Sequence, residues 1–217
     1  MIRLYDYALS GNCFKVRLLL GWLGLEHECS PVDFYPGFEH RGDAFLDVNP
    51  LGQLPVIEED GQFLRDAQAI LVHLATKFGR ETSWYPSGRV GEIQQWLAFA
   101  DSITCTISAA RLHDAMFFDL DATKARSGGK RLLRVLDDHL WFAEQNGQDW
   151  IVAGVAPTIA DIACFPYVAL AEEGGIDTAP YGATHRWMER FMRLDGFKPM
   201  AGMLPLPMPK PKAKDRA

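Results

Sequence analysis

The chain has 217 residues, of which 48% are hydrophobic and 23% are charged, and its formal net charge is −6. Such a chain forms one or two globular domains and buries about 70% of its unfolded surface. The acidic balance argues against a nucleic-acid partner. No apolar run approaches the ~18 residues of a membrane span, and the N-terminus leads directly into a strand pattern, so we expect a cytoplasmic protein without membrane contact.

The N-terminal third alternates strand and helix patterns. Residues 2–7 alternate apolar and polar side chains, which predicts a strand, and residues 8–12 form a loop. An apolar stripe beginning at Val16 predicts a helix that Gly24 ends, and residues 26–32 suit a second strand. Strand, helix and strand in this order imply a parallel pair with a right-handed crossover. Residues 34–48 hold at most a short helix near Asp43.

Residues 49–75 are predicted to form a strand, a tight turn, a second strand and a helix. The first strand begins at Val56, and Asp60 and Gly61 suit the turn of a hairpin. Asp66 is an N-cap candidate for an amphipathic helix that Gly79 can end. A hairpin edge and a helix N-terminus are therefore expected to lie side by side.

This neighbourhood suits a small acidic peptide. If the bond between Leu54 and Pro55 is cis, the Leu54 backbone would face outward as a free donor and acceptor. The first-turn N–H groups after Asp66 would attract a carboxylate, because they carry the positive end of the helix dipole. The alternative is a trans proline on an edge strand and a cap that only caps.

The second half of the chain carries helical patterns only. Residues 80–88 are polar and rich in turn formers, which marks a linker. Helices are expected over residues 93–107 and 132–143, and a last helix around Trp187 and Phe191. Thr158 and Asp161 have the spacing of a capping box before another helix, which Pro166 should kink. We therefore expect one domain over residues 1–79, a linker over 80–87, an all-helical domain over 88–197 and an exposed tail over 198–217.

The four cysteines are far apart and lack the spacing of a zinc site or a disulfide framework. No metal site is predicted. Cys29, Cys105 and Cys164 stand in apolar surroundings and are expected in the core. Cys13 opens a helix and is considered below.

Two motifs in this order resemble the cytosolic glutathione S-transferase family, with the serine-type, bacterial-like members as the nearest match. The first is Asn49-Pro50-Leu51-Gly52-Gln53-Leu54-Pro55-Val56 followed by Asp66-Ala67-Gln68, and the second is the Thr158-to-Asp161 cap. The resemblance implies a thioredoxin-like α/β N-terminal domain, an all-α C-terminal domain and a homodimer. It also implies detoxification by a transferase: glutathione is a co-substrate, no cofactor is used, and the activated thiolate attacks a small hydrophobic electrophile.

The resemblance also implies site residues. Ser10 stands where serine-type members carry the residue that hydrogen-bonds the thiolate, with Asn12 as a possible second donor. Tyr7 would take this role in a tyrosine-type enzyme, and Cys13 would form a mixed disulfide in a cysteine-type enzyme. Ser10 could also serve only as a helix cap.

Other positions would bind the tripeptide. The resemblance places the backbone of Leu54, before Pro55, on the cysteinyl unit, Gln53 and His40 on the glycyl carboxylate, and Asp66 with Ala67 at the γ-glutamyl end. An apolar acceptor site would be lined from the helical domain and its surroundings, and the candidates by position are Phe34, Arg111, His113, Met116 and Phe117.

Ala67 departs from the family pattern, which has Ser or Thr at this position. The missing hydroxyl removes one hydrogen bond to the γ-glutamyl carboxylate, which corresponds to about ten- to a hundredfold in affinity. Two alternatives to a transferase stay open, and Ala67 favours the second of them. One is a glutathione-dependent peroxide or disulfide reductase, and the other is a non-catalytic binding module of the same fold.

Overall fold

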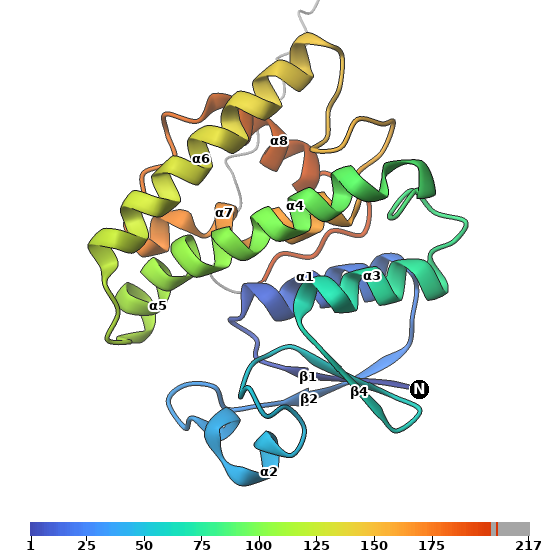
Figure 1. The fold of residues 1–217 in the computed structure, drawn as a ribbon, viewed down its shortest axis with the longest axis vertical. Coiled ribbons are helices and arrows are strands. Elements are labelled where there is room, and N and C mark those ends of the chain that lie inside the picture. The colour runs from blue at the N-terminus through green and yellow to red at the C-terminus, as the bar shows by residue number, and fades with distance from the viewer. Residues whose placement is uncertain (201–202, 204–217) are drawn as a thin grey trace, which may run out of the picture.

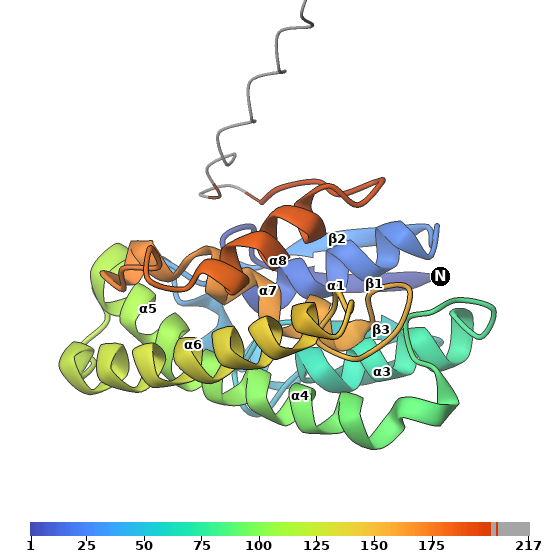
Figure 2. The ribbon, with the colours of Figure 1, turned by 90° about the horizontal axis from the view of Figure 1, so that it is seen from above.

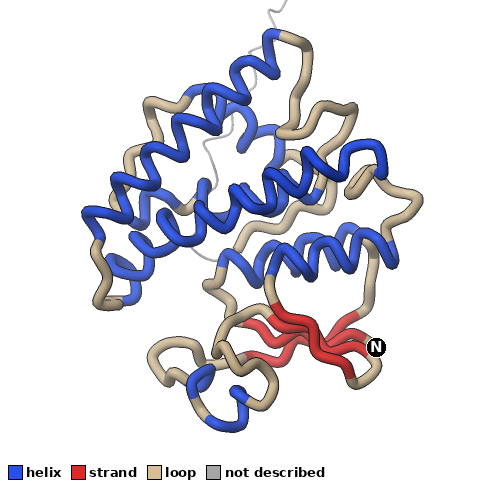
Figure 3. The backbone as a smooth tube through the Cα atoms, viewed as in Figure 1, coloured by secondary structure: helices blue, strands red, loops and turns tan. Residues whose placement is uncertain are grey.

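The computed structural model describes residues 1–200 and residue 203. The N-terminal domain contains a four-stranded sheet with the order β2-β1-β3-β4. Its strands are β1 (Ile2–Asp6), β2 (His27–Pro31), β3 (Val56–Glu59) and β4 (Gln62–Arg65). Strand β1 pairs in parallel with β2 and antiparallel with β3, which confirms the predicted crossover. All four strands lie together at one end of the molecule (Figure 3).

Two helices cover one face of this sheet. These are α1 (Gly11–Trp22) and α3 (Ala67–Phe78), which lie side by side between the sheet and the helical domain (Figure 1). The short helices η1 (Glu39–Arg41) and α2 (Asp43–Leu46) lie in the connection between β2 and β3. The sheet and its helices form the thioredoxin-like N-terminal domain that the sequence predicted.

The hairpin and the helix ends follow the local sequence signals. Asp60 and Gly61 both have positive φ values, 52° and 74°, as a two-residue primed turn between β3 and β4 requires. The Asp66 side chain caps α3 by accepting a hydrogen bond from the Ala69 N–H at 2.9 Å. The bond between Leu54 and Pro55 is cis, and not trans as the alternative had it.

The rest of the described chain is helical. After η2 (Ser87–Arg89) come α4 (Val90–Ile103), the π-helical turn η3 (Thr104–Ser108), α5 (Ala109–Met116), α6 (Ala122–Gln145), α7 (Ile159–Ala169), η4 (Ala171–Gly174) and α8 (Gly182–Met192). Helix α7 runs through the centre of the molecule and contacts α1, α3, α4 and α8 (Figure 2). One hydrophobic core therefore extends through both domains. No helix in residues 1–200 is both long and apolar enough to cross a bilayer.

The predicted helix over residues 93–107 is longer than expected. It continues through the π-helical turn into α5 and ends only at Phe117, whose φ of 57° lies in the left-handed region. No glycine marks this end, so the stop signal is absent from the sequence. The capping box at the start of α7 is confirmed. The Asp161 carboxylate accepts from the Thr158 N–H at 2.9 Å, and the Thr158 hydroxyl accepts from the Ala160 N–H in the first turn at 3.2 Å.

Two expectations about exposure were wrong. Cys29 and Cys105 are exposed, whereas Cys164 is buried as predicted. Cys29 lies on β2, an edge strand, and Cys105 lies in the π-helical turn, where it lines a cavity that is described below. Met200 was expected in an exposed tail but is buried against the core. The rest of that tail, apart from residues 198, 199 and 203, lies outside the described residues.

Candidate active site

A cavity of about 310 Å³ lies where the two domains meet. The N-terminal domain contributes the β1–α1 loop, the turn before β3 and the start of α3, and the helical domain contributes α4, the π-helical turn, α5 and α7. The lining residues that the sequence had singled out are Tyr7, Ser10, Asn12, Phe34, Gln53, Leu54, Pro55, Asp66, Ala67, Arg111 and Met116. Residues from the middle and the start of the chain thus meet at one site.

Ser10 is the N-cap of α1 and faces this cavity. Its Oγ accepts a hydrogen bond from the Cys13 N–H at 3.2 Å, and its backbone is extended, with φ −81° and ψ 120°. Accepting that bond leaves the hydroxyl proton free to be donated. The positive end of the α1 dipole lies beside it. Capping and donation into the cavity are therefore compatible in this geometry.

Of the residues beside Ser10, Tyr7 and Cys13 are engaged elsewhere, whereas Asn12 has a buried side-chain Oδ1 without a hydrogen-bond partner in the described part of the chain. The Tyr7 hydroxyl donates to the Tyr35 carbonyl at 3.4 Å, and burial raises the pKa of Tyr7. The Asn12 N–H donates to the Tyr167 hydroxyl at 3.3 Å. Cys13 is fully buried in the core, and burial raises the pKa of its thiol to about 12. A thiol with this pKa is almost entirely protonated at neutral pH and is a poor nucleophile.

The turn before β3 presents free backbone groups to the cavity. In the described part of the chain, the Leu54 N–H and C=O make no backbone hydrogen bond. Asn49, which is 1% exposed, holds the turn from beneath: its Nδ2 donates to the Gln53 carbonyl at 2.8 Å and its Oδ1 accepts from the Leu51 N–H at 3.1 Å. The free donor and acceptor pair at Leu54 can bind an extended peptide segment.

The start of α3 forms a polar wall of the same cavity. Asp66 has φ 74° and ψ 124°, a conformation that non-glycine residues rarely adopt. Behind it, Gln68 donates a hydrogen bond from Nε2 to the Asp101 carboxylate of α4. Partial burial and the nearby Asp66 raise the pKa of Asp101. Two carboxylates and the first turn of a helix can together receive a ligand that carries both an ammonium and a carboxylate.

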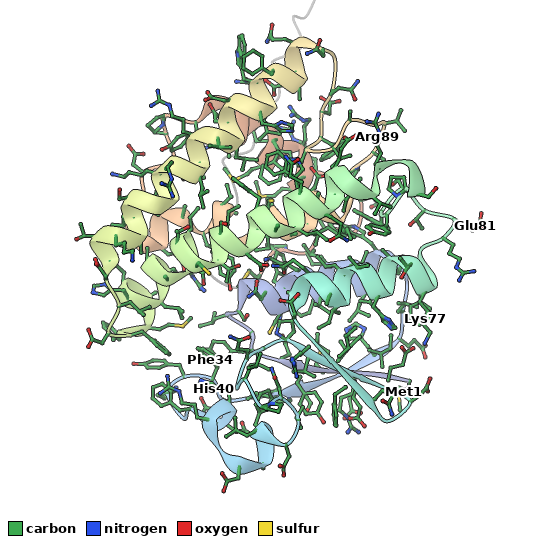
Figure 4. All side chains as sticks on the ribbon, viewed as in Figure 1. Met1, Phe34, His40, Lys77, Glu81 and Arg89 are labelled. Atoms are coloured by element: carbon green, nitrogen blue, oxygen red, sulfur yellow. The ribbon has the colours of Figure 1, made fainter. Side chains whose placement is uncertain are left out.

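His40 lies in a neighbouring groove and not in the cavity itself. This groove has a volume of about 450 Å³ and shares Phe34 and Gln53 with the cavity. The His40 ring stacks on Phe34 with ring centroids 4.1 Å apart, and the two residues lie together at the edge of the N-terminal domain (Figure 4). Burial, and then the nearby Arg41, lower the pKa of His40.

Apolar and aromatic side chains also line the cavity. Phe34, Leu112 and Met116 line it together with Tyr167 of α7. Two of the expected acceptor-site residues lie elsewhere: His113 pairs with Asp114 at 2.7 Å, and Phe117 is 80% exposed. His113 follows Leu112 on α5 and therefore faces another direction, and Phe117 follows the helix in a left-handed conformation.

Sequence reasoning missed several lining residues. Asp101, Thr104, Cys105 and Ser108 come from α4 and the π-helical turn, and Tyr167 comes from α7. None stands in a motif, and only the packing of the helical domain brings them to Ser10. Gly11 was the one available hint, because a Cβ at this position would approach the Tyr167 ring to 2.7 Å. A glycine directly after a cap is consistent with such a close approach.

Comparisons with known proteins agree with this architecture. Residues 4–82 match the sequence model described as "Glutathione S-transferase, N-terminal domain". Glutathione S-transferase 3 of Zea mays is 26% identical over 218 residues, which cover 95% of this chain and 96% of the maize protein. The crystal structure of a glutathione S-transferase from Pseudomonas fluorescens is 31% identical, with a TM-score of 0.81, and covers 92% of this chain and 98% of that one.

A third similar structure is a complex. Ure2p with bound glutathione is 26% identical to this chain, has a TM-score of 0.79, and covers 90% of this chain and 95% of its own.

Proposed function

Because the chain belongs to the glutathione S-transferase family, we propose that it binds glutathione in the cavity and transfers it to a small, largely apolar electrophile. Ser10 stabilises the thiolate of the bound tripeptide. The observation that carries this proposal is the geometry of Ser10: it lines the cavity, and its Oγ accepts from the Cys13 N–H, which leaves the hydroxyl proton free to be donated.

The energetic demand on Ser10 is modest. A free thiol with a pKa near 8.5 is only a few per cent ionised at pH 7, and a downward shift of about 2 units makes it mostly thiolate, which corresponds to ~2.7 kcal/mol. A hydrogen bond to a charged acceptor contributes about 1.5 to 3 kcal/mol. One serine hydroxyl at a helix N-terminus can therefore supply the shift. Asn12 is the second candidate donor.

The tripeptide is proposed to lie along the N-terminal domain. Its cysteinyl unit pairs with the free Leu54 backbone, which places the sulfur toward Ser10. Its γ-glutamyl end meets Asp66 and the first turn of α3, and its glycyl carboxylate extends toward Gln53 and the groove of His40. The shared lining residues Phe34 and Gln53 support a continuous path from the cavity to that groove.

The electrophile occupies the apolar side of the cavity. Phe34, Leu112 and Met116 offer a surface for an apolar molecule close to Ser10. The reaction forms a bond between the glutathione sulfur and the electrophilic carbon, and it releases the leaving group or completes an addition.

The proposal is tested with Ser10→Ala and an activated aryl chloride as the electrophile. Turnover should fall by about ten- to a hundredfold, because the thiolate loses a hydrogen bond to a charged acceptor. Calorimetry should show that glutathione still binds, since the backbone of Leu54 and the start of α3 are unchanged. Ser10→Thr keeps the hydroxyl and should retain most of the activity. Equal turnover in Ser10→Ala and the native protein would rule out this role.

A second function is favoured by Ala67. Because this position lacks the usual hydroxyl and so loses one hydrogen bond to the γ-glutamyl carboxylate, the alternative function is a non-catalytic binding module of the same fold. The two functions separate in one experiment. In calorimetry, no detectable glutathione binding by the native protein, with binding restored in Ala67→Ser, would support the module.

A further inference from the structure

The loop that leads to Ser10 is fixed at four successive carbonyl groups. The Tyr7 carbonyl accepts from the Ser10 N–H at 2.9 Å, and the Ser10 carbonyl accepts from the Phe14 N–H at 2.9 Å. Between them, the Ala8 carbonyl accepts from Arg17 Nη2 at 3.1 Å, and the Leu9 carbonyl accepts from Arg111 at 2.8 Å. Three of these donors belong to the N-terminal domain. The fourth, Arg111, reaches across from α5 of the helical domain.

Arg111 is buried, and its guanidinium makes two hydrogen-bonded contacts through different nitrogens. Its side chain is only 5% exposed, and its Nε pairs with Glu173 Oε2 at 2.5 Å while its Nη1 holds the Leu9 carbonyl. A planar guanidinium with two such contacts on different edges has a fixed orientation. The hydrogen bond to Leu9 has a charged donor in a place sheltered from water, where such bonds are strong.

The partner of Arg111 is itself held in place. Glu173 lies in η4, and a Cβ on the next residue, Gly174, would come within 2.8 Å of the Arg111 backbone nitrogen. The Gly174 carbonyl accepts from Arg126 Nε at 2.9 Å, and Arg126 also pairs with Asp114 at 2.5 Å. Contacts among α5, η4 and α6 thus hold the backbone of Arg111 and its partner Glu173 in place, and the Arg111 side chain extends from there to the Ser10 loop.

We propose that Arg111 is a positioning residue for the Ser10 loop: by holding the Leu9 carbonyl from the helical domain, it fixes where the Ser10 hydroxyl stands relative to the glutathione sulfur. This inference rests on the proposed function of Ser10. Arg111 also lines the cavity, as the sequence suggested. The role proposed here is the one that its guanidinium has toward the loop backbone.

The first test replaces Arg111 by Met, which keeps the length of the side chain but removes both contacts. We expect kcat to fall by about tenfold or more, up to the loss expected for Ser10→Ala, because a displacement of the order of 1 Å at the reacting group is sufficient for such a loss. The KM for glutathione should change little, since Leu54 and α3 are untouched. The apparent pKa of the thiol of bound glutathione should rise. It is read from the pH profile of kcat/KM for the electrophile at saturating glutathione.

Two further variants keep the proposal testable if Arg111→Met folds poorly. Arg111→Lys keeps the charge, but its single ammonium group cannot contact Glu173 and the Leu9 carbonyl in the way that a planar guanidinium does. Compared with Arg111→Met, it should therefore recover more of the stability than of kcat. Glu173→Gln keeps Arg111 but replaces its ion pair with a weaker neutral contact. It should therefore lower kcat by a smaller factor than Arg111→Met does. If both variants keep native kcat and the native pH profile, the positioning role is excluded.

A matched control is Arg190→Met in α8. Arg190 also joins separate segments, because it pairs with Glu144 at 3.1 Å and donates to the Asp149 carbonyl at 3.0 Å, but it lies outside the lining of the cavity. Its loss should lower the melting temperature and leave the thiol pKa unchanged. An Arg111→Met variant that behaves like this control would reduce Arg111 to a structural residue and overturn the proposal.

The double variant Ser10→Ala/Arg111→Met separates this inference from the proposed function. If Arg111 acts through Ser10, the double variant should be no slower than Ser10→Ala alone. Losses that multiply would show that Arg111 acts independently of Ser10, which would contradict the positioning role while leaving the proposed function intact. If Ser10→Ala itself has no effect, the proposed function fails first.

Discussion

Ala67 is the residue at which the chain departs most clearly from its family. Its replacement by serine gives a prediction about glutathione affinity. The methyl group is buried at the start of α3 and faces the cavity. Ala67→Ser should tighten glutathione binding by about ten- to a hundredfold, because a hydroxyl adds one hydrogen bond to a carboxylate. Isothermal titration calorimetry measures the change. Ala69→Ser, on the exposed side of the same helix turn, is the control and should leave the affinity unchanged. Equal affinities in all three proteins would contradict the proposed position of the γ-glutamyl end.

Lys15 gives a second prediction at this scale. Its side chain is fully buried on α1, with Nζ 5.4 Å from the centre of the Tyr167 ring, and burial lowers its pKa to about 8 despite the nearby Cys164, Asp101 and Asp66. The folded state therefore disfavours the charged form. Lys15→Met should stabilise the protein at pH 7 by about 1 to 3 kcal/mol, since a buried charge is replaced by a well-packed apolar chain.

The pH dependence of this effect has a definite sign. Between the folded pKa of about 8 and the ordinary value of 10.5, the unfolded chain binds the proton and the folded chain does not, so the stability of the native protein rises with pH. The advantage of Lys15→Met should therefore be largest at and below pH 7 and shrink by pH 10. Urea denaturation at the two pH values measures it. A variant that is less stable than the native protein by the same amount at both would contradict the burial cost.

Some site residues could be predicted because each stands beside a local signal. Ser10 follows a strand and caps a helix, Leu54 precedes a proline, and Asp66 opens an amphipathic stripe. Asp101 and Tyr167 lie on α4 and α7 and carry no such signal. Their place in the cavity is decided by contacts between helices that are far apart in the sequence, and no local pattern encodes those contacts.

At the scale of elements, the start of α7 shows how one side chain can organise a domain. Asp161 is completely buried and accepts hydrogen bonds from the Thr158 N–H at 2.9 Å, the Ile151 N–H at 3.0 Å and the Trp187 Nε1–H at 2.9 Å. It thereby joins α7, the loop before it and α8. Burial raises the pKa of Asp161, and these three donors oppose that rise.

Asp161→Ala should therefore be strongly destabilising. Removing the carboxylate leaves three buried donors without an acceptor, and a loss of about 3 to 5 kcal/mol in the free energy of unfolding is expected. Chemical denaturation provides the measurement. Asp177→Ala is a suitable control, because Asp177 is an exposed residue that makes a single bond to the Ala179 N–H, and its loss should cost less than about 1 kcal/mol. A loss this small for Asp161→Ala would show that the buried carboxylate is dispensable.

The elements that the sequence predicted well have their causes in neighbouring residues. The primed turn at Asp60 and Gly61, the Asp66 cap and the Thr158 capping box each need only a few adjacent positions. The π-helical turn and the extension to Met116 were not predicted, since they depend on how α5 meets η4 and on a left-handed residue that is not glycine. Tertiary contacts outweigh local propensity there.

At the scale of the whole molecule, the two domains behave as one body around the cavity. The larger of two hydrophobic clusters extends through both domains, and the domain boundary is crossed by Arg111 to Leu9, by Tyr167 to Asn12 and by the stacked rings of Phe34 and Phe118. The sequence predicted two domains and a linker between them, but not how closely the helical domain holds the Ser10 loop. The homodimer that the family resemblance implies stays a prediction.

The central claim is that Ser10 lowers the pKa of the bound glutathione thiol, and the most direct measurement is the ultraviolet absorbance of the thiolate as a function of pH. We expect the native protein with saturating glutathione to show an apparent thiol pKa about 2 units below the free value near 8.5. Ser10→Ala, with binding retained, should return the pKa most of the way to the free value. The same lowered pKa in both proteins, or a native pKa equal to that of free glutathione, would contradict the account.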